Sequence, residues 1–395
     1  MELKPDYKQT EVGVIPEDWE LRRLGDMAAV ATGSTPPTRN PANYGDEFLF
    51  VSPGDLGENM FVLDTAKKLS RTGFALSRRF PKGSILFTCI GSTIGKCGIA
   101  SIELSSNQQI NAVLPSPGFS TDYIYYSLCA LAPTIRASAG EQAVPIVNKS
   151  QFCQTLLPFP PLCEQRAIAA ALSDVDAVIG ALEKLIAKKR DLKQAAMQQL
   201  LTGRQRLPGF DGKWEEKKLG DVAPLQRGFD LPTAQLKPGG YPVVYSNGVL
   251  NHHADFKVKA PGVVTGRSGT IGKVTFVEQH YWPHNTSLWV TNFKGNAPKF
   301  IFYLYGMIGF ERFGTGSGVP TLNRNDVHAF SIRIPPSSEE QRAIAAVLSD
   351  MDAEIGALQG RRDKTRALKQ GMMQELLTGR IRLPMPAEEE VAATP

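Results

Sequence analysis

The sequence predicts an α+β protein in which two mixed α/β domains are joined by two long antiparallel helices that form a coiled-coil spacer. Three observations predict this fold class. A long helical segment occurs twice, each copy follows a globular stretch, and the two globular stretches share short motifs. The pattern indicates an internal duplication with pseudo-twofold symmetry, and a repeat of this length decides the architecture.

The duplicated segment runs from 164 to 208 and again from 340 to 384, with no gap and a constant offset of 176 residues. Both copies open with Glu-Gln-Arg, and about two-thirds of the aligned positions are identical. Each copy follows a diproline, which suits a helix entrance but not a helix interior. Each ends near Thr-Gly-Arg, where Gly203 or Gly379 can take the left-handed conformation that closes a helix.

Apolar residues in both copies recur in steps of four and three, the spacing that keeps side chains on one narrow helix face. About 38 helical residues make a rod of roughly 55 to 60 Å, and a rod with so narrow a stripe needs a partner helix. We expect the two copies to pack on each other; the alternative is that each helix packs only on its own domain. The predicted helix-pair interface consists of Ile168, Leu172, Val175, Ile179, Leu182, Ile186, Ile344, Leu348, Met351, Ile355 and Leu358.

Length and composition are those of a folded protein of two or three domains, with 395 residues and 42% hydrophobic content. No apolar run is long enough to span a membrane. Charged residues near the N-terminus occupy the place where a signal peptide needs an apolar core. We therefore expect a cytoplasmic protein with no membrane segment.

Five cysteines occur without a C-x-x-C pair, which favours reduced thiols and a cytoplasmic location. The five histidines do not complete a set of closely spaced zinc ligands, so we expect no metal site. A net charge of +5 permits nucleic-acid binding without requiring it. Basic clusters such as Lys188-Lys189-Arg190 form either a solvated helix face or a contact with phosphate or a partner.

Five segments follow from this organisation. Two of them are globular, two are the repeated helices, and the last is an acidic, Pro/Ala-rich tail that we expect to be disordered. We expect short strands at Phe48–Val51 and Ser84–Ile90 and a short helix at Ile124–Leu131. The predicted boundaries are 1–158 for the first domain, 159–208 for the central helix, 209–334 for the second domain, 335–384 for the C-terminal helix and 385–395 for the tail.

The two globular segments share anchor motifs. Trp19 and Trp214 each precede a Leu-Gly-Asp triplet, and Thr93–Lys96 matches Thr270–Lys273 as Thr-Ile-Gly-Lys. The second domain is shorter by about 20 residues between these two anchors. Between the anchors the two sequences share little. This predicts a duplicated scaffold in which each copy recognises a different ligand or target.

Two variable domains, each closed by Pro-Pro-x-x-Glu-Gln-Arg-x-Ile and a long helix ending in Leu-Leu-Thr-Gly-Arg, resemble the specificity subunit of type I restriction-modification enzymes. The resemblance covers essentially the whole chain. In that family each variable domain is a target recognition domain that reads one half of a split DNA sequence, and the paired helices act as a spacer. For half-sites about one to one and a half turns apart, a rod of roughly 55 to 60 Å is a suitable spacer.

The resemblance implies a non-catalytic DNA-recognition subunit whose ligand is double-stranded DNA. It further implies two methyltransferase subunits docked on the helices and two motor-nuclease (restriction and translocase) subunits in the complete enzyme. AdoMet, ATP and magnesium would then belong to those partner subunits, with no cofactor in this chain. Together the subunits would direct methylation and restriction.

Enzymatic alternatives find little support in the sequence. Gly91–Cys97 lacks the spacing and the final Ser or Thr of a phosphate-binding loop, and no Asn/Asp-Pro-Pro-aromatic motif of adenine methyltransferases occurs. Two alternatives stay open: a methyltransferase or nuclease with an unrecognised active site, and a purely structural coiled-coil adaptor. The first would act on DNA by itself, and the second would show no sequence preference.

Candidate DNA-binding residues are polar loop residues of the types that contact bases and phosphates. The alternative for any one of them is a solvated or locally hydrogen-bonded residue. In the first domain they are Ser34, Thr35, Arg39, Lys96, Asn107, Gln108 and Gln109, and in the second Arg227, Asn247, Arg267, Ser268, Lys273, His284 and Asn285.

Some polar residues have competing roles. Lys96 and Lys273 occupy matching motifs, which favours phosphate neutralisation over base discrimination. Asn148 and Asn323 are expected to form turns rather than to read DNA. Arg166 and Arg342 are expected to pair with carboxylates such as Glu164 and Glu340, or with a methyltransferase subunit.

Overall fold

The computed structural model describes residues 6–57, 59–140, 143–315 and 320–384. The chain divides into two compact units, the first formed by residues 1–181 and 363–395 and the second by residues 182–362. The dividing points therefore fall inside both long helices. The five segments expected from the sequence mark a different kind of boundary and stay a prediction.

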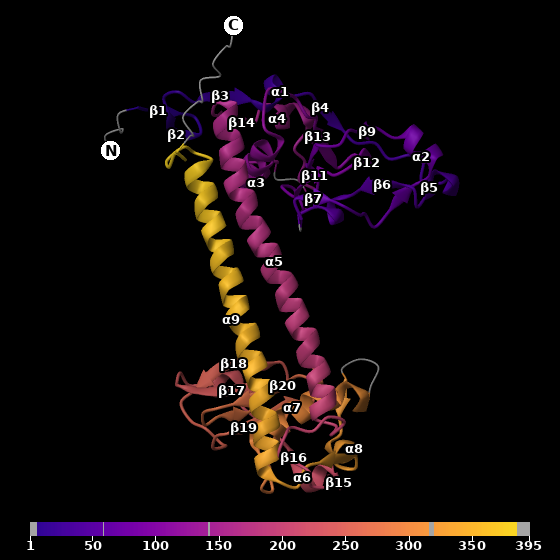
Figure 1. Ribbon diagram of the computed structural model, residues 1–395, viewed down its shortest axis with the longest axis vertical. Helices are drawn as coiled ribbons and strands as arrows, with labels where there is room; N and C mark the ends of the chain where they lie inside the picture. The colour runs from indigo at the N-terminus through magenta and orange to yellow at the C-terminus, as the bar shows by residue number, and fades with distance from the viewer. Residues whose placement is uncertain (1–5, 58, 141–142, 316–319, 385–395) are drawn as a thin grey trace. The chain divides into compact units, whose positions relative to one another are not determined.

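The two long helices begin and end close to where the sequence predicts them. Helix α5 (Leu162–Leu200) starts directly after the first diproline and helix α9 (Ser338–Leu376) starts shortly after the second, and each has 39 residues (Figure 1). Gly203 has φ +70° and Gly379 has φ +69°, which confirms the left-handed turn predicted at both helix ends.

Unit 1 contains two five-stranded sheets. One sheet has the order β4-β13-β10-β11-β7, and the other has the order β5-β8-β6-β12-β9. Two-stranded pairings join β1 with β2 and β14 with β3. The elements are β1 (Tyr7–Thr10), β2 (Gly13–Pro16), β3 (Glu20–Arg23), α1 (Leu24–Met27), β4 (Val30–Thr32), η1 (Pro41–Asn43), β5 (Tyr44–Gly45), β6 (Phe48–Val51), η2 (Pro53–Asp55), β7 (Phe61–Val62), β8 (Lys68–Leu69), α2 (Arg71–Leu76), β9 (Arg79–Phe80), β10 (Ile85–Thr88), β11 (Cys97–Ala100), β12 (Leu104–Ser106), β13 (Ile110–Val113), α3 (Thr121–Ala137), α4 (Lys149–Cys153) and β14 (Leu156–Phe159).

Unit 2 repeats this plan with fewer elements. A four-stranded sheet has the order β16-β22-β19-β20, a three-stranded sheet has the order β18-β17-β21, and β15 pairs with β25. The elements are β15 (Glu215–Lys218), α6 (Leu219–Val222), β16 (Leu225–Arg227), η3 (Thr233–Gln235), β17 (Tyr241–Tyr245), β18 (Gly248–His253), β19 (Gly262–Gly266), β20 (Val274–Val277), β21 (Trp282–Pro283), β22 (Ser287–Val290), α7 (Pro298–Ile308), η4 (Phe310–Phe313), β23 (Gly314–Thr315), β24 (Thr321–Leu322), α8 (Arg324–His328) and β25 (Ser331–Ile334).

Local expectations from the sequence have different outcomes. The strand at Phe48–Val51 is confirmed as β6, and β10 lies inside the segment expected at 84–90. The helix expected at 124–131 is longer, because Ser120 caps it at Thr121 and it continues through Pro133 to Ala137. Asn148 and Asn323 have local roles, since their side chains cap α4 and α8.

Both long helices contribute to the core of each unit. In unit 1, Ile168 and Leu172 of α5 are buried in one cluster with Leu376 at the end of α9. In unit 2, Ile344 and Leu348 of α9 are buried in one cluster with Leu200 at the end of α5. Burying such a side chain contributes about 1.5 to 3 kcal/mol. Each domain core therefore includes the start of one helix and the end of the other.

Ion pairs between the helices follow the same antiparallel arrangement within each unit. In unit 1, Lys369 lies 2.7 Å from Asp176, and in unit 2, Lys189 lies 2.6 Å from Glu354. The apolar residues predicted to form the helix-pair interface are not all buried. The full interface therefore stays a prediction. Ile179, Leu182, Ile186 and Ile355 are buried, while Val175, Met351 and Leu358 are half-buried.

Candidate nucleic-acid interface

Two loops of unit 1 lie side by side at one end of its first sheet. Strand β4 leads into Gly33, Ser34 and Thr35, and the loop from Asn107 to Gln109 leads into β13, the neighbouring strand. The Thr35 hydroxyl donates to the Gln108 Oε1 at 2.5 Å. A side chain on Gly33 would place its Cβ 2.2 Å from the Asn107 carbonyl oxygen, so the close approach of the loops requires glycine.

The hairpin loop between β10 and β11 adjoins this pair of loops. The Cys89 N–H donates to the Gln109 carbonyl at 2.8 Å, and the Asn107 side chain donates to the Gln109 Oε1 at 3.0 Å. Five of the seven predicted residues of this domain, Ser34, Thr35, Asn107, Gln108 and Gln109, therefore lie in one cluster. Arg39 is exposed, and the described residues show no contact between it and these loops.

Unit 2 has the same arrangement of two adjacent loops, but the loops carry different side chains. Gly228 follows β16, and a Cβ on it would lie 2.2 Å from the carbonyl oxygen of His284, which precedes β22. The Asn285 side chain donates to the Asp230 carboxylate, and Arg227 lies 3.1 Å from the same oxygen. The Arg267 and Ser268 N–H groups donate to the Thr286 carbonyl at 2.9 and 3.1 Å.

Backbone hydrogen bonds establish the correspondence between the two frames. The Gly33 N–H donates to the Ile110 carbonyl at 2.9 Å, and the Gly228 N–H donates to the Ser287 carbonyl at 3.0 Å. With these bonds aligned, the Thr35–Gln108 pair of unit 1 occupies the place of the Asp230–Asn285 pair in unit 2. We call these two sets of loops the reading loops: 33–35 with 107–109 in unit 1, and 228–230 with 284–286 in unit 2.

Lys96 and Lys273 also take matching positions. The Lys96 side chain lies against Gly57, whose Cβ would be 3.3 Å from the Lys96 Cγ, and Lys273 lies against Gly248. The Lys273 ammonium donates to the carbonyl of Asn247, which is another predicted residue of unit 2. The matching positions agree with a shared role, and phosphate neutralisation stays a prediction.

Two residues of unit 2 were missed by sequence reasoning. The ring of Tyr245 lies 4.2 Å from that of His284, and Asp230 joins Arg227 to Asn285. Burial lowers the pKa of His284 more than the nearby Asp230 raises it. An aromatic residue directly before the Ser-Asn-Gly turn at 246–248 is the signal that could have identified Tyr245.

The Glu-Gln-Arg motif of α5 is explained by contacts in unit 1. Buried Glu164 accepts a hydrogen bond from the Trp19 indole at 3.1 Å and two from the Arg382 guanidinium at 2.8 Å each. Arg382 also binds Asp18 at 2.8 and 3.0 Å. The expected pairing of Glu164 with Arg166 is wrong, because residues two apart on a helix point in different directions and Arg166 is exposed.

Unit 2 repeats this contact with its own residues. Glu340 accepts from the Trp214 indole at 3.2 Å and from Arg206 at 2.6 and 2.8 Å. The expected Glu340–Arg342 pair is therefore wrong for the same reason. We call Trp19–Glu164–Arg382 and Trp214–Glu340–Arg206 the helix clamps. Docking of a partner on Arg166 or Arg342 stays a prediction.

The glutamine of the Glu-Gln-Arg motif is hydrogen-bonded to the start of the helix of its unit, α3 in unit 1 and α7 in unit 2. Gln165 accepts from the Ser120 N–H at 2.9 Å and donates to the Pro160 carbonyl at 2.8 Å. Gln341 accepts from the Ala297 N–H at 2.8 Å and donates to the Pro335 carbonyl at 2.9 Å. In both units the side chain therefore connects the start of the long helix to the start of α3 or α7.

A further contact repeats at the middle of each long helix. The Tyr126 hydroxyl donates to Asp176 at 2.8 Å beside Lys369 in unit 1. The Tyr303 hydroxyl donates to Asp352 at 2.8 Å beside Lys193 in unit 2. Burial and the adjacent carboxylate raise the pKa of both tyrosines, so they stay protonated donors.

The described residues contain no group of three or more His, Cys, Asp or Glu side chains that could hold a metal ion. All five cysteines are free thiols, and burial raises the pKa of Cys89 to about 12. No described helix is long and apolar enough to cross a membrane.

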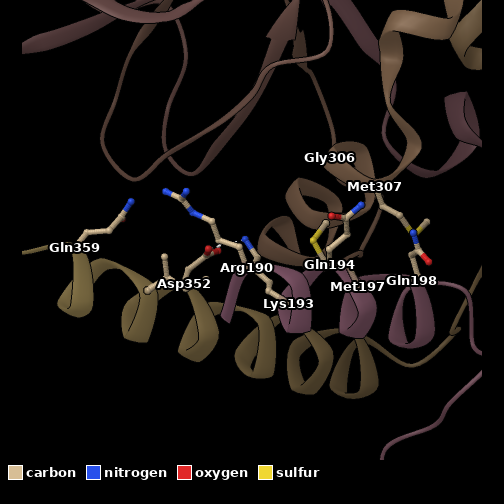
Figure 2. Close-up of a pocket in the computed structure, with 10 residues that line it drawn as sticks. Arg190, Lys193, Gln194, Met197, Gln198, Gly306, Met307, Asp352 and Gln359 are labelled. Atoms are coloured by element: carbon tan, nitrogen blue, oxygen red, sulfur yellow. Dashed lines mark hydrogen bonds and ion pairs between the residues drawn. The ribbon is translucent and has the colours of Figure 1, made fainter. Parts of the chain in front are cut away.

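Each unit has a groove between its domain helix and the end of a long helix. In unit 1 the groove measures about 700 Å³ and lies between α3 and α9. In unit 2 a hollow of about 530 Å³ lies among α5, α7 and α9, and another of about 440 Å³ lies among α5, α7 and β25. Gln198 and Met307 line both hollows. Figure 2 shows the larger hollow, which is lined by Arg190, Lys193, Gln194, Met197, Gln198, Gly306, Met307, Asp352, Ile355 and Gln359.

Comparison with known proteins decides the family. The model of the type I restriction modification DNA specificity domain matches residues 16–192 and 211–364, one match for each copy. The chain belongs to this family. Its members are the specificity subunits of type I restriction-modification enzymes, which recognise DNA, assemble with other subunits and are the non-catalytic components of the complex.

Similar proteins agree with this assignment. The type I restriction enzyme MjaVIII specificity subunit of Methanocaldococcus jannaschii is 24% identical, with 96% of each chain covered. The MjaIX specificity subunit of the same organism is 26% identical over 58% of this chain and 57% of that protein.

The fold is shared with solved structures. The S subunit of the type I restriction-modification system from M. genitalium has a TM-score of 0.62, with 16% identity, 95% of this chain and 99% of that chain covered. A second solved structure, described as the structural basis of complex assembly and conformational transition of the type I R-M system, has a TM-score of 0.61 and 17% identity. The match covers 93% of this chain and 99% of that chain.

Proposed function

We propose that each unit of this specificity subunit reads one half of a bipartite DNA target. The observation that carries the proposal is the shared frame of the reading loops with different side chains. A hydroxyl–amide pair, Thr35 and Gln108, occupies in unit 1 the place of the carboxylate–amide pair Asp230 and Asn285 in unit 2. Base edges are distinguished by such donor and acceptor patterns, so the two units would select different half-sites.

Cationic side chains near the reading loops would position the DNA backbone. Lys96 and Lys273 sit in matching places, so they suit phosphate contacts that are independent of sequence. Arg227 and Arg267 differ from their counterparts in unit 1, which favours base contact for them. Arginine recognises guanine through two hydrogen bonds when its side chain reaches the major groove.

The paired helices would set the spacer between the half-sites and carry the methyltransferase subunits. A helix of 39 residues measures about 58 Å at about 1.5 Å per residue, which supports the role of a spacer. Two methyltransferase subunits and two motor-nuclease subunits complete the proposed complex. AdoMet belongs to the former and ATP and magnesium to the motor-nuclease, and the assembly acts on DNA in the cytoplasm.

Methylation mapping tests this proposal. The chain is co-expressed with the methyltransferase subunit encoded beside it, and modified bases are located by single-molecule sequencing of host DNA. We expect a split motif with one modified base in each half, which disappears when this chain is deleted. Methylation that persists after the deletion would contradict the proposal, and DNA modification or cleavage by the purified chain alone would favour an enzyme.

The spacer role has its own test. One helical turn is inserted into α5 and α9 at matching positions, and the gap between the two half-sites is mapped in the same way. We expect a longer preferred gap, because the insertion lengthens both helices equally. An unchanged gap would contradict the spacer role while leaving half-site recognition intact.

A further inference from the structure

The edge strand β18 of unit 2 carries an irregularity beside the reading loops. Strand β17 lies between β18 and β21, so β18 is the outer strand of this sheet. Val244 of β17 lies opposite Val249 of β18. The preceding residue, Val243, lies opposite Asn251, so Leu250 is the extra residue of a β-bulge. Bulges of this kind are frequent beside functional sites, where they redirect a side chain.

Contacts around the bulge connect it to the reading loops. The Asn251 side chain donates to the Tyr245 hydroxyl at 3.2 Å, and the Tyr245 ring lies 4.2 Å from the His284 ring. At the turn of the same hairpin, the Ser246 N–H donates to the Thr286 hydroxyl at 3.3 Å. His284 and Thr286 belong to the reading loops, so the β17–β18 hairpin extends the surface that these loops form.

The side chain on the bulge is apolar and exposed. Leu250 is 59% exposed, and Val249 beside it is 42% exposed. Apolar side chains on the outer strand of a sheet favour association with another molecule, which is why edge strands usually avoid them. The exposure of Leu250 therefore needs a reason other than folding.

Backbone hydrogen bonds align this sheet with the second sheet of unit 1. The His284 N–H donates to the Val244 carbonyl at 2.9 Å, and the Asn107 N–H donates to the Val51 carbonyl at 3.0 Å. Val244 of β17 and Val51 of β6 therefore correspond. Strand β8 lies beside β6 as β18 lies beside β17, so β8 and the residues before it show what unit 1 has at the place of the bulge.

Unit 1 has a short side chain at this place. The Phe50 N–H donates to the Lys67 carbonyl at 3.2 Å, which is the pairing that Asn251 makes in unit 2. The residue before Lys67 is Ala66, and the residue before Asn251 is Leu250. Both are exposed. A long apolar side chain is therefore presented at this position by unit 2 and not by unit 1.

The surroundings of Leu250 favour a base edge as its partner. The major groove of DNA admits a two-stranded β-ribbon such as the β17–β18 hairpin. Asn285 of the adjoining reading loop is of the residue type that binds adenine in that groove. The apolar group that base edges present there is the C5-methyl of thymine, which cytosine lacks.

We propose that Leu250 reads a thymine in the half-site of unit 2 by packing against its C5-methyl group in the major groove. The contact needs no hydrogen bond and adds to what the neighbouring amide reads. Unit 1, with Ala66 at the corresponding position, reads its half-site without it. The inference rests on the proposed function, since it needs unit 2 to face a DNA half-site.

Uracil substitution tests the contact, because uracil is thymine without the C5-methyl group and pairs with adenine in the same way. The complex of this chain with the methyltransferase subunit is titrated, at one fixed salt concentration, with duplexes that carry the mapped motif. Each thymine is replaced in turn in the half that changes when residues 209–334 are exchanged. We expect one position at which uracil weakens binding about fourfold, as for one buried methyl group.

Matched variants assign the effect to the bulge. Leu250→Ala should weaken binding of the thymine duplex at least about fourfold and reduce the uracil effect at that position to less than about 1.5-fold. Leu250→Ile keeps an apolar side chain of the same size and should retain most of the uracil effect. Leu76→Ala is the control, because Leu76 is 60% exposed and lies in unit 1, and it should leave the uracil effect at about fourfold. Thermal melting verifies that all three variants fold.

Other outcomes would overturn the inference while leaving the proposed function intact. These are a uracil effect that persists in Leu250→Ala, unaltered affinity of this variant for the thymine duplex, or a half-site of unit 2 without an A·T pair. Equal weakening of every duplex with a smaller DNA bend, measured by fluorescence resonance energy transfer, would instead assign Leu250 to a wedge between base pairs. Loss of the methyltransferase subunit with unaltered DNA affinity would assign it to a protein partner. A complex that methylates no split motif would overturn the proposed function as well.

Discussion

The two copies of the repeat have the same residues in the helix clamps but different side chains in the reading loops. The clamps repeat residue for residue, with Trp19–Glu164–Arg382 in unit 1 and Trp214–Glu340–Arg206 in unit 2. The reading loops repeat their backbone but not their side chains. A buried carboxylate requires a particular partner, whereas a loop held by backbone bonds tolerates many side chains. The clamp residues therefore hold the fold, whereas the side chains of the reading loops differ between the two units.

The largest expected effect concerns the clamps. Removing one partner of a buried ion pair leaves the other uncompensated, so Glu340→Ala should lower the free energy of unfolding by about 3 kcal/mol. Glu164→Ala should cost less, because Arg382 keeps Asp18 as a second partner. Urea unfolding followed by tryptophan fluorescence measures both changes. The exposed Glu103→Ala is the control, and a loss below about 1 kcal/mol for Glu340→Ala would show that the clamp is dispensable.

The next effect concerns the glycines that let the reading loops approach each other. An added Cβ would lie 2.2 Å from a carbonyl oxygen at Gly33 and at Gly228, so alanine must displace one loop. We expect Gly33→Ala and Gly228→Ala each to weaken binding of the target duplex by about 2 kcal/mol, or roughly 30-fold.

The matched controls are Gly118→Ala and Gly240→Ala, where an added Cβ meets nothing closer than 3.7 Å. Fluorescence anisotropy with labelled duplex, at one fixed salt concentration, compares all four variants. Equal affinities for the loop and control variants would contradict the assignment of these loops to DNA.

A smaller effect on DNA binding is expected from removing the side-chain amides of the reading loops. Gln108→Ala and Asn285→Ala each remove one donor and acceptor pair, which is worth about 1 to 3 kcal/mol of discrimination at one base pair. Competition assays with duplexes altered at single positions should show relaxed preference in one half only, a different half for each variant. Relaxation in both halves by one variant would show that the units do not read independently.

The smallest effect is the contribution of His328, in unit 2, to the pH dependence of stability. Nε2 of His328 accepts a hydrogen bond from the Leu225 N–H at 2.8 Å, and burial, followed by the charge of Arg324, lowers the pKa of His328. A lowered pKa in the folded state means that protonation favours unfolding. The contribution of His328 to the free energy of unfolding is therefore fully present above the ordinary histidine pKa of about 6.5. It is lost as the pH falls below that value.

The corresponding position in unit 1 provides the contrast. A Cβ on Gly220 would contact His328, and a Cβ on Gly25 would contact Cys153 in the same way, so Cys153 takes the place of His328. Urea midpoints at pH 7.5 and 5.5 should differ less in His328→Asn than in the unaltered chain. An unchanged difference would assign the pH dependence to other groups, including His284, whose pKa burial also lowers.

Sequence reasoning succeeded where the determinants are local or repeated. The start and end of α5 and α9 follow from the diprolines and from Gly203 and Gly379. It failed for the clamp partners, because Glu164 and Arg382 are 218 residues apart and nothing local connects them. Proximity in sequence favours Arg166 as the partner of Glu164, but residues two apart on a helix point in different directions.

The candidate site shows the same limit. The sequence indicates polar loop residues in each domain separately, whereas the backbone of the folded unit brings Thr35 to Gln108 and Asp230 to Asn285. The correspondence was hidden because unit 1 carries additional residues, including α2, between the strands that hold its loops. Tyr245 and Asp230 were missed because stacking and bridging contacts depend on strands that pair only in the folded domain.

The most direct test of separate reading by the two units is an exchange of residues 209–334 for the corresponding segment of another family member with a different target. Methylated motifs are then mapped in cells that carry the hybrid and the same methyltransferase subunit. Our account predicts that one half of the motif changes while the other half is retained. A motif that is unchanged, or that changes in both halves, would contradict it.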